Sequence, residues 1–227
     1  MKQEITINEA IALIESTATI LQKDILRELK AYGDNNIKVI LYAGDTSLPE
    51  LIVGEAVVIV NGNLNVTTII SDCDGVDSSL LIVLGNVSCK NVITLSAMYI
   101  TGNLQVAHTL LGDSLNDYVT HVGGDFEVRT IIEGGHWIKV QGEATFQYLY
   151  HSHCDAVDKN GTLQPNLADN DLMEDFENNP DEYVGRSYVP MLEEVLDEDG
   201  YYDLPKAIAF IRNGGEWFCA PPEAAAN

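Results

Sequence analysis

Apolar and polar residues follow two different periods along this chain. Between residues 7 and 31, apolar residues recur largely at intervals of three and four, which is the spacing of one face of an α-helix. Thr6 and Glu9 have the spacing of a capping box, so the first helix is expected to begin directly after Thr6. The pattern breaks about halfway, and Thr17 or Thr19 could begin a second helix.

The helical pattern ends at Gly33-Asp34-Asn35-Asn36, a run of residues that favour turns. Residues 37 to 41 follow as a short apolar run that is typical of a strand. We therefore expect an N-terminal helical cap over residues 1–36, in front of a β-rich part of the chain.

The β-rich part contains an internal repeat that can be aligned on one glycine. Its five glycines are separated by 23, 17, 22 and 18 residues. In each copy the residues two before, two after and four after the glycine are apolar, while those between them are mostly polar, as in strands with one buried face. The five copies occupy residues 60–66, 83–89, 100–106, 122–128 and 140–146.

Two further columns run through the copies. An apolar residue eight positions after each glycine predicts a second short strand in every unit. These residues are Ile70, Ile93, Leu110, Ile132 and Tyr150. The residue directly after each glycine is polar, and stacked coils would bring these residues into one ladder. They are Asn63, Asn86, Asn103, Asp125 and Glu143.

Stacking of the units explains how such short strands could enclose a core. Coils about 4.8 Å apart bury one another's inward side chains and pair their backbones. The sequence therefore predicts a mainly β protein, with a short β-solenoid of about five coils over residues 37–154. An antiparallel sandwich is the alternative, although it gives no reason for one glycine register to recur five times.

Residues 155–227 have a different composition, with 17 acidic and 4 basic side chains. Short acidic helices are expected at residues 166–176 and 190–196. A more apolar helix is expected at residues 204–212, with Pro205 in its first turn and Asn213-Gly214-Gly215 at its end. We expect this acidic, partly helical region to pack on the solenoid.

The whole chain has 35 acidic and 12 basic residues, which gives a formal net charge of −23. Such a surface repels phosphate backbones and anionic membranes, so neither nucleic-acid binding nor membrane binding is expected. The absence of a signal-peptide pattern and of a run of about 18 apolar residues predicts a cytoplasmic protein. The four cysteines lack Cys-x-x-Cys spacing and are expected to be reduced.

The recurring Val-x-Gly-[Asn/Asp]-[Leu/Phe]-x-Val pattern over residues 60–146 resembles the bacterial polymer-forming proteins related to bactofilins. This resemblance implies a compact right-handed β-helix whose subunits assemble end to end through open terminal coils. The flanking segments depart from that plan, because both would cover the exposed strand edges of the solenoid. Capped acidic solenoids are also similar in character to bacterial immunity proteins encoded beside polymorphic toxins.

Two groups of residues could support chemistry. His151, His153 and Cys154 could ligate a metal, but a structural zinc site needs four ligands, and neither a metal nor another cofactor is expected. Asp125 and Glu127, with Arg129 beside them and Glu143 one coil later, could form the carboxylate pair of a glycan-active enzyme. A solvated face is the preferred interpretation, because five coils offer little groove, and enzymatic activity is not expected.

The acidic C-terminal region is the predicted partner-binding surface. Tyrosines beside dense carboxylates suit a basic protein, with tyrosines as anchors and charge steering the encounter. The alternative is that the acidic residues only keep the region soluble. The predicted partner-binding residues are Asp171, Glu174, Asp175, Glu177, Asp181, Glu182, Tyr183, Tyr188, Glu193, Glu194, Asp197, Glu198, Asp199, Tyr201 and Tyr202.

These patterns lead to three hypotheses for the function. The first is a monomer or small homo-oligomer without enzymatic activity, an immunity protein that neutralises a cognate basic toxin by occluding its active site. A bactofilin-like structural polymer subunit is the second, and a glycan-active β-helix enzyme is the third.

Overall fold

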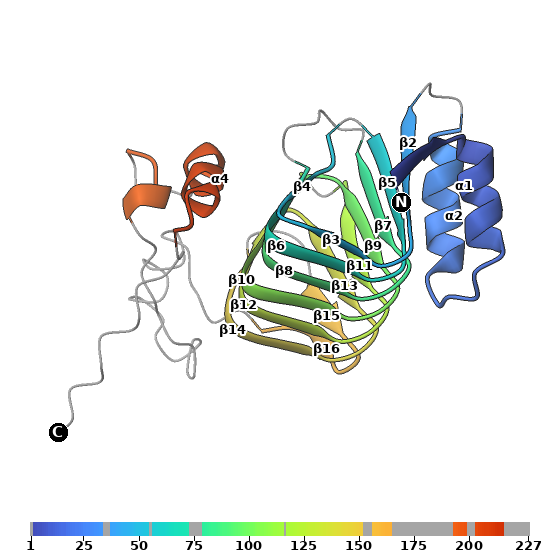
Figure 1. Cartoon of the computed structure of the whole chain (residues 1–227). Coiled ribbons are helices and arrows are strands. Elements are labelled where there is room, and N and C mark those ends of the chain that lie inside the picture. The colour runs from blue at the N-terminus through green and yellow to red at the C-terminus, as the bar shows by residue number, and fades with distance from the viewer. Residues whose placement is uncertain are drawn as a thin grey trace.

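The computed structural model describes residues 2–33, 37–54, 56–72, 79–115, 117–151, 156–164, 193–198 and 203–215. Its strands form two sheets that face each other across a shared core (Figure 1). Sheet A contains β1 (Lys2–Ile5), β2 (Lys38–Ala43), β5 (Ala56–Asn61), β7 (Leu80–Val83), β9 (Ala97–Ile100), β11 (Val119–Val122), β13 (Trp137–Val140), β15 (Ala156–Asp158) and β16 (Gly161–Thr162). Sheet B contains β3 (Thr46–Leu48), β4 (Leu51–Ile52), β6 (Leu64–Ser71), β8 (Val87–Thr94), β10 (Leu104–Asp113), β12 (Phe126–Gly134) and β14 (Ala144–His151).

The chain winds through these sheets as a β-solenoid. Each coil places one strand in sheet A and continues into sheet B, and successive coils pair in parallel, as in β5 with β7 and β6 with β8. The solenoid prediction is confirmed, and the antiparallel sandwich is wrong. The described residues form six coils, because residues 42–48 make a first coil that the repeat pattern missed. In that coil Thr46 stands two positions after Gly44, where the other copies have an apolar residue.

The predicted polar ladder is present on the outside of the turns between the two sheets. The backbone N–H of each ladder residue donates to the Oδ1 atom of the ladder residue one coil earlier, and the chain of bonds begins at Asp45. The N to Oδ1 distances are 2.7 Å for Asn63 to Asp45, 2.9 Å for Asn86 to Asn63, 2.8 Å for Asn103 to Asn86, 2.9 Å for Asp125 to Asn103 and 2.9 Å for Glu143 to Asp125. Five stacked hydrogen bonds therefore fix the spacing of the coils.

The second apolar column needs a correction. Strands β6 and β10 each carry one more residue in the bend of sheet B than their neighbours, so the register shifts after Val66 and after Val106. The column eight residues after the glycine does not mark a separate second strand, because its members lie in the sheet B strands that begin two residues after the glycine. It also mixes inward with outward positions. Ile93, Ile132 and Tyr150 belong to an outer cluster. The inward column consists of Ile70, Val92, Leu110, Ile131 and Leu149.

The core between the sheets is built from the inward columns. Valine, leucine and isoleucine side chains fill it, and Val87 and Val106 are both buried, as the alternation predicts. Cys89 lies in the same core, and burial raises the pKa of its thiol to about 12. This thiol therefore acts as a small apolar side chain rather than as a nucleophile.

Two helices precede the first coil, α1 (Ile7–Glu15) and α2 (Gln22–Ala31). The capping box of α1 is confirmed, because Glu9 N donates to Thr6 Oγ1 at 3.2 Å and Thr6 N donates to Glu9 Oε2 at 2.7 Å. Neither Thr17 nor Thr19 begins the second helix. The second helix instead begins at Gln22. The side-chain amide of Gln22 donates to the carbonyl oxygens of Ile14 and Thr17 and so satisfies acceptors at the C-terminal end of α1.

The helices cover the outer face of sheet A rather than its end (Figure 1). Ile14, Ile25 and Leu29 pack on outward residues of β2, β5, β7 and β9. These strands are therefore apolar on both faces, as in β5, where five successive residues are buried. The end of the sheet is covered by β1, which pairs antiparallel with β2 and was not predicted.

The C-terminal part adds four described elements. Sheet A continues through β15, which pairs in parallel with β13, and ends in the antiparallel strand β16. A 3-10 helix, η2 (Glu193–Val195), lies within the predicted acidic helix at residues 190–196. The apolar helix is confirmed as α4 (Leu204–Arg212), followed by Asn213 as its C-cap. The helix expected at residues 166–176 lies outside the described residues.

Candidate partner-binding surface

The predicted acidic surface is only partly within the described residues. Glu194 and Glu198 are exposed and Asp197 is half-buried, at and just after η2. For Glu193 the structure describes only the backbone, in η2. The remaining predicted residues lie outside the described part of the chain; they are Asp171, Glu174, Asp175, Glu177, Asp181, Glu182, Tyr183, Tyr188, Asp199, Tyr201 and Tyr202.

The described acidic segment is anchored on the solenoid through an apolar cluster. Val195 of η2 is fully buried, as are Ala207 and Ile211 of α4. They pack on outward side chains of sheet B, and we call this contact the apolar seat of the region. It includes Ile93, Ile132 and Tyr150, the outward members of the column eight residues after the glycine. The sheet B members of the cluster are Ile93, Leu111, Ile132, Tyr148 and Tyr150.

Polar contacts tie η2 to α4. Asp203 caps α4, because Lys206 N donates to Asp203 Oδ1 at 2.9 Å, and Asp203 N donates to Val195 O at 3.0 Å. The Lys206 ammonium donates to Leu196 O at 2.6 Å. These contacts hold the backbone segment of Glu194 and Glu198 in place against α4.

Several other carboxylates in the described residues have structural roles. Asp158 Oδ2 accepts from Ala144 N at 3.0 Å and so ties the last coil to the segment that follows it, in the direction opposite to the ladder bonds. Asp72 is buried, and its two oxygens accept from Thr94 Oγ1 and from Leu95 N, each at 2.6 Å. Burial raises the pKa of Asp72, against the effect of these hydrogen bonds.

The carboxylates proposed for glycan chemistry lie in one shallow groove on sheet B. Gln105, Asp125, Glu127 and Glu143 line this groove of about 570 Å³. Each carboxylate there has a local partner. Asp125 Oδ1 accepts from Glu143 N in the ladder, Glu127 accepts from Gln105 Nε2 at 3.1 Å, and Glu143 pairs with Lys159 at 3.0 Å. The arrangement suits a solvated polar face.

A buried polar corner joins sheet B to sheet A and was not predicted. His136 is fully buried, with Nε2 2.9 Å from Thr120 Oγ1 and Nδ1 3.0 Å from Ser114 Oγ. Its backbone N donates to Glu133 Oε1 at 2.8 Å, and Glu133 is also fully buried. Burial lowers the pKa of His136 to about 4, and burial together with Glu133 raises the pKa of Asp113 to about 6.

The side chains of His136 and Glu133 are both fully buried and have no surface that a ligand could contact. We therefore assign this corner a structural role. It holds the turn between β10 and β11, where Tyr118 N donates to Ser114 Oγ at 3.3 Å. The residues come from three coils at different positions in the repeat, so a column search could not find them. The available signal was a charged residue and a histidine, Glu133 and His136, close together beside an apolar strand.

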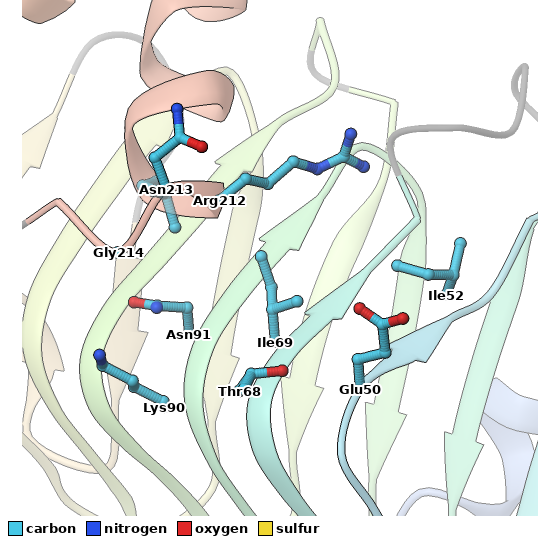
Figure 2. Close-up of a pocket in the computed structure, with 10 residues that line it drawn as sticks. Glu50, Ile52, Thr68, Ile69, Lys90, Asn91, Arg212, Asn213 and Gly214 are labelled. Carbon is cyan, nitrogen blue, oxygen red and sulfur yellow. The ribbon is translucent and has the colours of Figure 1, made fainter.

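A second groove with convergent polar and apolar groups lies beside the end of α4 (Figure 2). It has a volume of about 580 Å³ and lies between the C-terminus of α4 and the first three coils of sheet B. Figure 2 shows Lys90 and Glu50 on opposite sides of the groove, with Ile69 between them. The groove also contains Ile52, which is 43% exposed, and Asn91, which is 4% exposed.

The candidate metal ligands are not brought together in the described residues. Strand β14 ends at His151, while His153 and Cys154 lie outside the described part of the chain. Across the described ranges, no three His, Cys, Asp or Glu side chains are grouped closely enough to hold a metal ion. None of the described helices is long and apolar enough to span a membrane.

Comparisons with known proteins give no relative from which to transfer a function: no family model, no curated protein and no solved structure matches the chain.

Proposed function

We propose that this chain is a non-enzymatic protein-binding protein whose acidic C-terminal region binds a basic partner. In its specific form, the proposal is a cytoplasmic bacterial immunity protein that occludes the active site of a cognate basic toxin. The observation that carries it is the apolar seat of η2 and α4 on sheet B, which holds Glu194 and Glu198 on a rigid scaffold. A preorganised charged surface loses little conformational entropy on binding and accelerates encounter with a partner of opposite charge.

Two features make the other hypotheses weaker. A bactofilin-like polymer would stack through open coils, whereas sheet A ends in the antiparallel strands β1 and β16. A glycan-active enzyme would need a free carboxylate pair, whereas Asp125 and Glu143 are engaged in the ladder and in an ion pair. Protein binding requires neither an open coil nor a free pair.

The first test is co-expression of the chain with the product of the adjacent gene, followed by purification and a toxicity assay. We expect a complex that weakens as the salt concentration rises, because screening reduces attraction between unlike surface charges. We also expect the chain to relieve the toxicity of its partner. If the neighbouring product neither binds nor becomes less toxic, the immunity proposal fails.

The second test locates the binding surface. The triple variant Glu194→Gln, Asp197→Asn and Glu198→Gln removes three charges from the seated segment. We expect about tenfold weaker binding, mainly through a slower association rate. A matched control, Glu15→Gln, Asp117→Asn and Glu127→Gln, removes three charges elsewhere. Equal losses in both variants would mean that net charge alone, and not this surface, attracts the partner.

A further inference from the structure

The groove beside α4 is an open part of the outer face of sheet B. It lies next to the apolar part of that face that Val195, Ala207 and Ile211 cover. Ile52 and Ile69 provide its apolar surface, and Ile52 is one of few large apolar side chains exposed in the described residues. A small ligand with an apolar portion could bury this surface.

The groove also has polar groups that lack partners of their own. Neither Lys90 nor Glu50 forms an ion pair within the described ranges, although the chain has only 12 basic residues against 35 acidic ones. Asn91 is 4% exposed, and its Oδ1 accepts from Thr109 N at 3.2 Å. Among the described residues nothing accepts from its Nδ2, which leaves a nearly buried donor at the groove.

The spacing of these groups restricts the chemistry of the ligand. Glu50 lies in the first coil and Lys90 in the third, so two strand spacings of about 4.8 Å place their backbones about 10 Å apart. An extended peptide of three residues spans about 10 Å between its charged ends. Glu50 attracts an ammonium group, whereas Lys90 and Arg212, which also lines the groove, attract a carboxylate. A ligand with one charge of each sign matches this lining.

We propose that this groove binds a short peptide of about three residues with free termini. The peptide's ammonium group pairs with Glu50, its carboxylate pairs with Lys90, and Asn91 Nδ2 donates to the peptide. A central apolar side chain packs on Ile52 and Ile69. This site is independent of the acidic surface proposed for partner binding.

Nuclear magnetic resonance titration of the full chain with the tripeptide Ala-Leu-Ala tests this proposal. We expect saturable shifts of the Asn91 side-chain amide, with a dissociation constant of about 1 mM or tighter. We expect Glu50→Gln and Lys90→Gln each to weaken binding about tenfold. The control variants Glu15→Gln and Lys23→Gln change exposed charges on the N-terminal helices and should leave the titration unchanged.

Blocked peptides identify which end of the ligand each side chain reads. The peptide with an amidated C-terminus should bind the wild type about tenfold more weakly than the free peptide. The substitution Lys90→Gln should not weaken the binding of this amidated peptide further. The N-acetyl peptide should likewise bind the wild type about tenfold more weakly, and Glu50→Gln should not weaken its binding further. An N-acetyl peptide that binds as tightly as the free peptide would instead assign the groove to protein C-termini and overturn the proposal. Absence of saturable shifts would also overturn it.

Discussion

At the scale of single residues, the glycine column is fixed by the polar ladder beside it. A Cβ atom on Gly102 would overlap Asn86 Oδ1 and would lie 2.8 Å from Gly85 O. The same Oδ1 atom accepts the hydrogen bond from Asn103 N in the next coil. The glycine therefore makes room for the side chain that spaces the coils, which gives a physical reason for a Gly-[Asn/Asp] signature in the repeat.

We expect Gly102→Ala to lower the free energy of unfolding by about 2–4 kcal/mol. The added methyl forces apart two packed coils and disturbs the bond from Asn103 N to Asn86 Oδ1. Urea denaturation measures the change. Ser88→Ala is a suitable control because Ser88 is exposed on the same sheet, and it should change stability by less than about 0.5 kcal/mol. A loss below about 1 kcal/mol for Gly102→Ala would contradict the steric argument.

The buried polar corner contains two groups whose effects on pH stability oppose each other. The pKa of Asp113 is raised to about 6, so its contribution to stability is present below about pH 4 and is lost as the pH rises through about 6. The pKa of His136 is lowered to about 4, so its contribution is present above about pH 6.5 and is lost as the pH falls toward 4. Between these values the two slopes partly cancel.

Asp113→Asn should separate the two effects. We expect this variant to be about 2 kcal/mol more stable than the wild type at pH 7, because it removes a partly buried charge beside Glu133. We also expect a steeper loss of stability between pH 6.5 and pH 4.5, because the opposing slope from Asp113 is removed while the slope from His136 remains. Denaturation curves across this range provide the measurement, with Asp117→Asn as an exposed control. Parallel pH profiles for wild type and Asp113→Asn would rule out this account.

At the scale of secondary structure, local patterns predicted the strands and α4 but not how they fit together. The alternation around each glycine placed the inward residues Val87 and Val106 in the core, because one buried face forces a period of two. The extra residue in the bends of β6 and β10 was not predictable, since it depends on which coils lie next to each other. The strand β1 was missed because its burial is low and β2, with which it pairs, lies more than 30 residues away.

The candidate site was predicted less completely than the fold. Charge patterning indicated the acidic segment of Glu194 and Glu198, but not its apolar seat, because the local pattern does not show that Ile93 and Ile132 face away from the core. The groove that contains Glu50 and Lys90 is formed by the first three coils and the end of α4. Nothing in the local sequence indicates that these residues meet, since their proximity follows from the stacking of coils.

We expect Ile211→Asp to release α4 while the solenoid stays folded. Ile211 is 1% exposed in the apolar seat, so a charge there would lie among Ile93, Leu111 and other buried side chains. Hydrogen exchange should show lost protection in α4 and unchanged protection in β8 and β10. The substitution Ile208→Asp, at a half-buried position of the same helix, should have a smaller effect. Uniform loss of protection throughout the chain would mean that α4 and the solenoid unfold as one unit.

At the scale of the whole molecule, the first coil combines several features that discourage growth of the stack. In sheet A the edge of β2 is paired with β1. In sheet B the first coil is split into β3 and β4, with Pro49 between them, and both strands are very short. Short edge strands and proline are common protections against pairing between molecules. A formal net charge of −23 adds repulsion between copies, although salt screens it beyond about 8 Å.

If β1 is the main barrier in sheet A, removal of Lys2–Ile5 should permit self-association through β2. We expect the deletion variant to sediment as species that grow with protein and salt concentration, because salt weakens the repulsion while the unpaired backbone groups of β2 remain available. The wild type should remain a discrete species under the same conditions. The variant Lys2→Ala with Glu4→Ala keeps the backbone pairing of β1 without changing net charge, and it should behave like the wild type. A deletion variant that stays folded and discrete at high salt would show that charge, or another edge, prevents stacking, and that β1 serves a different purpose.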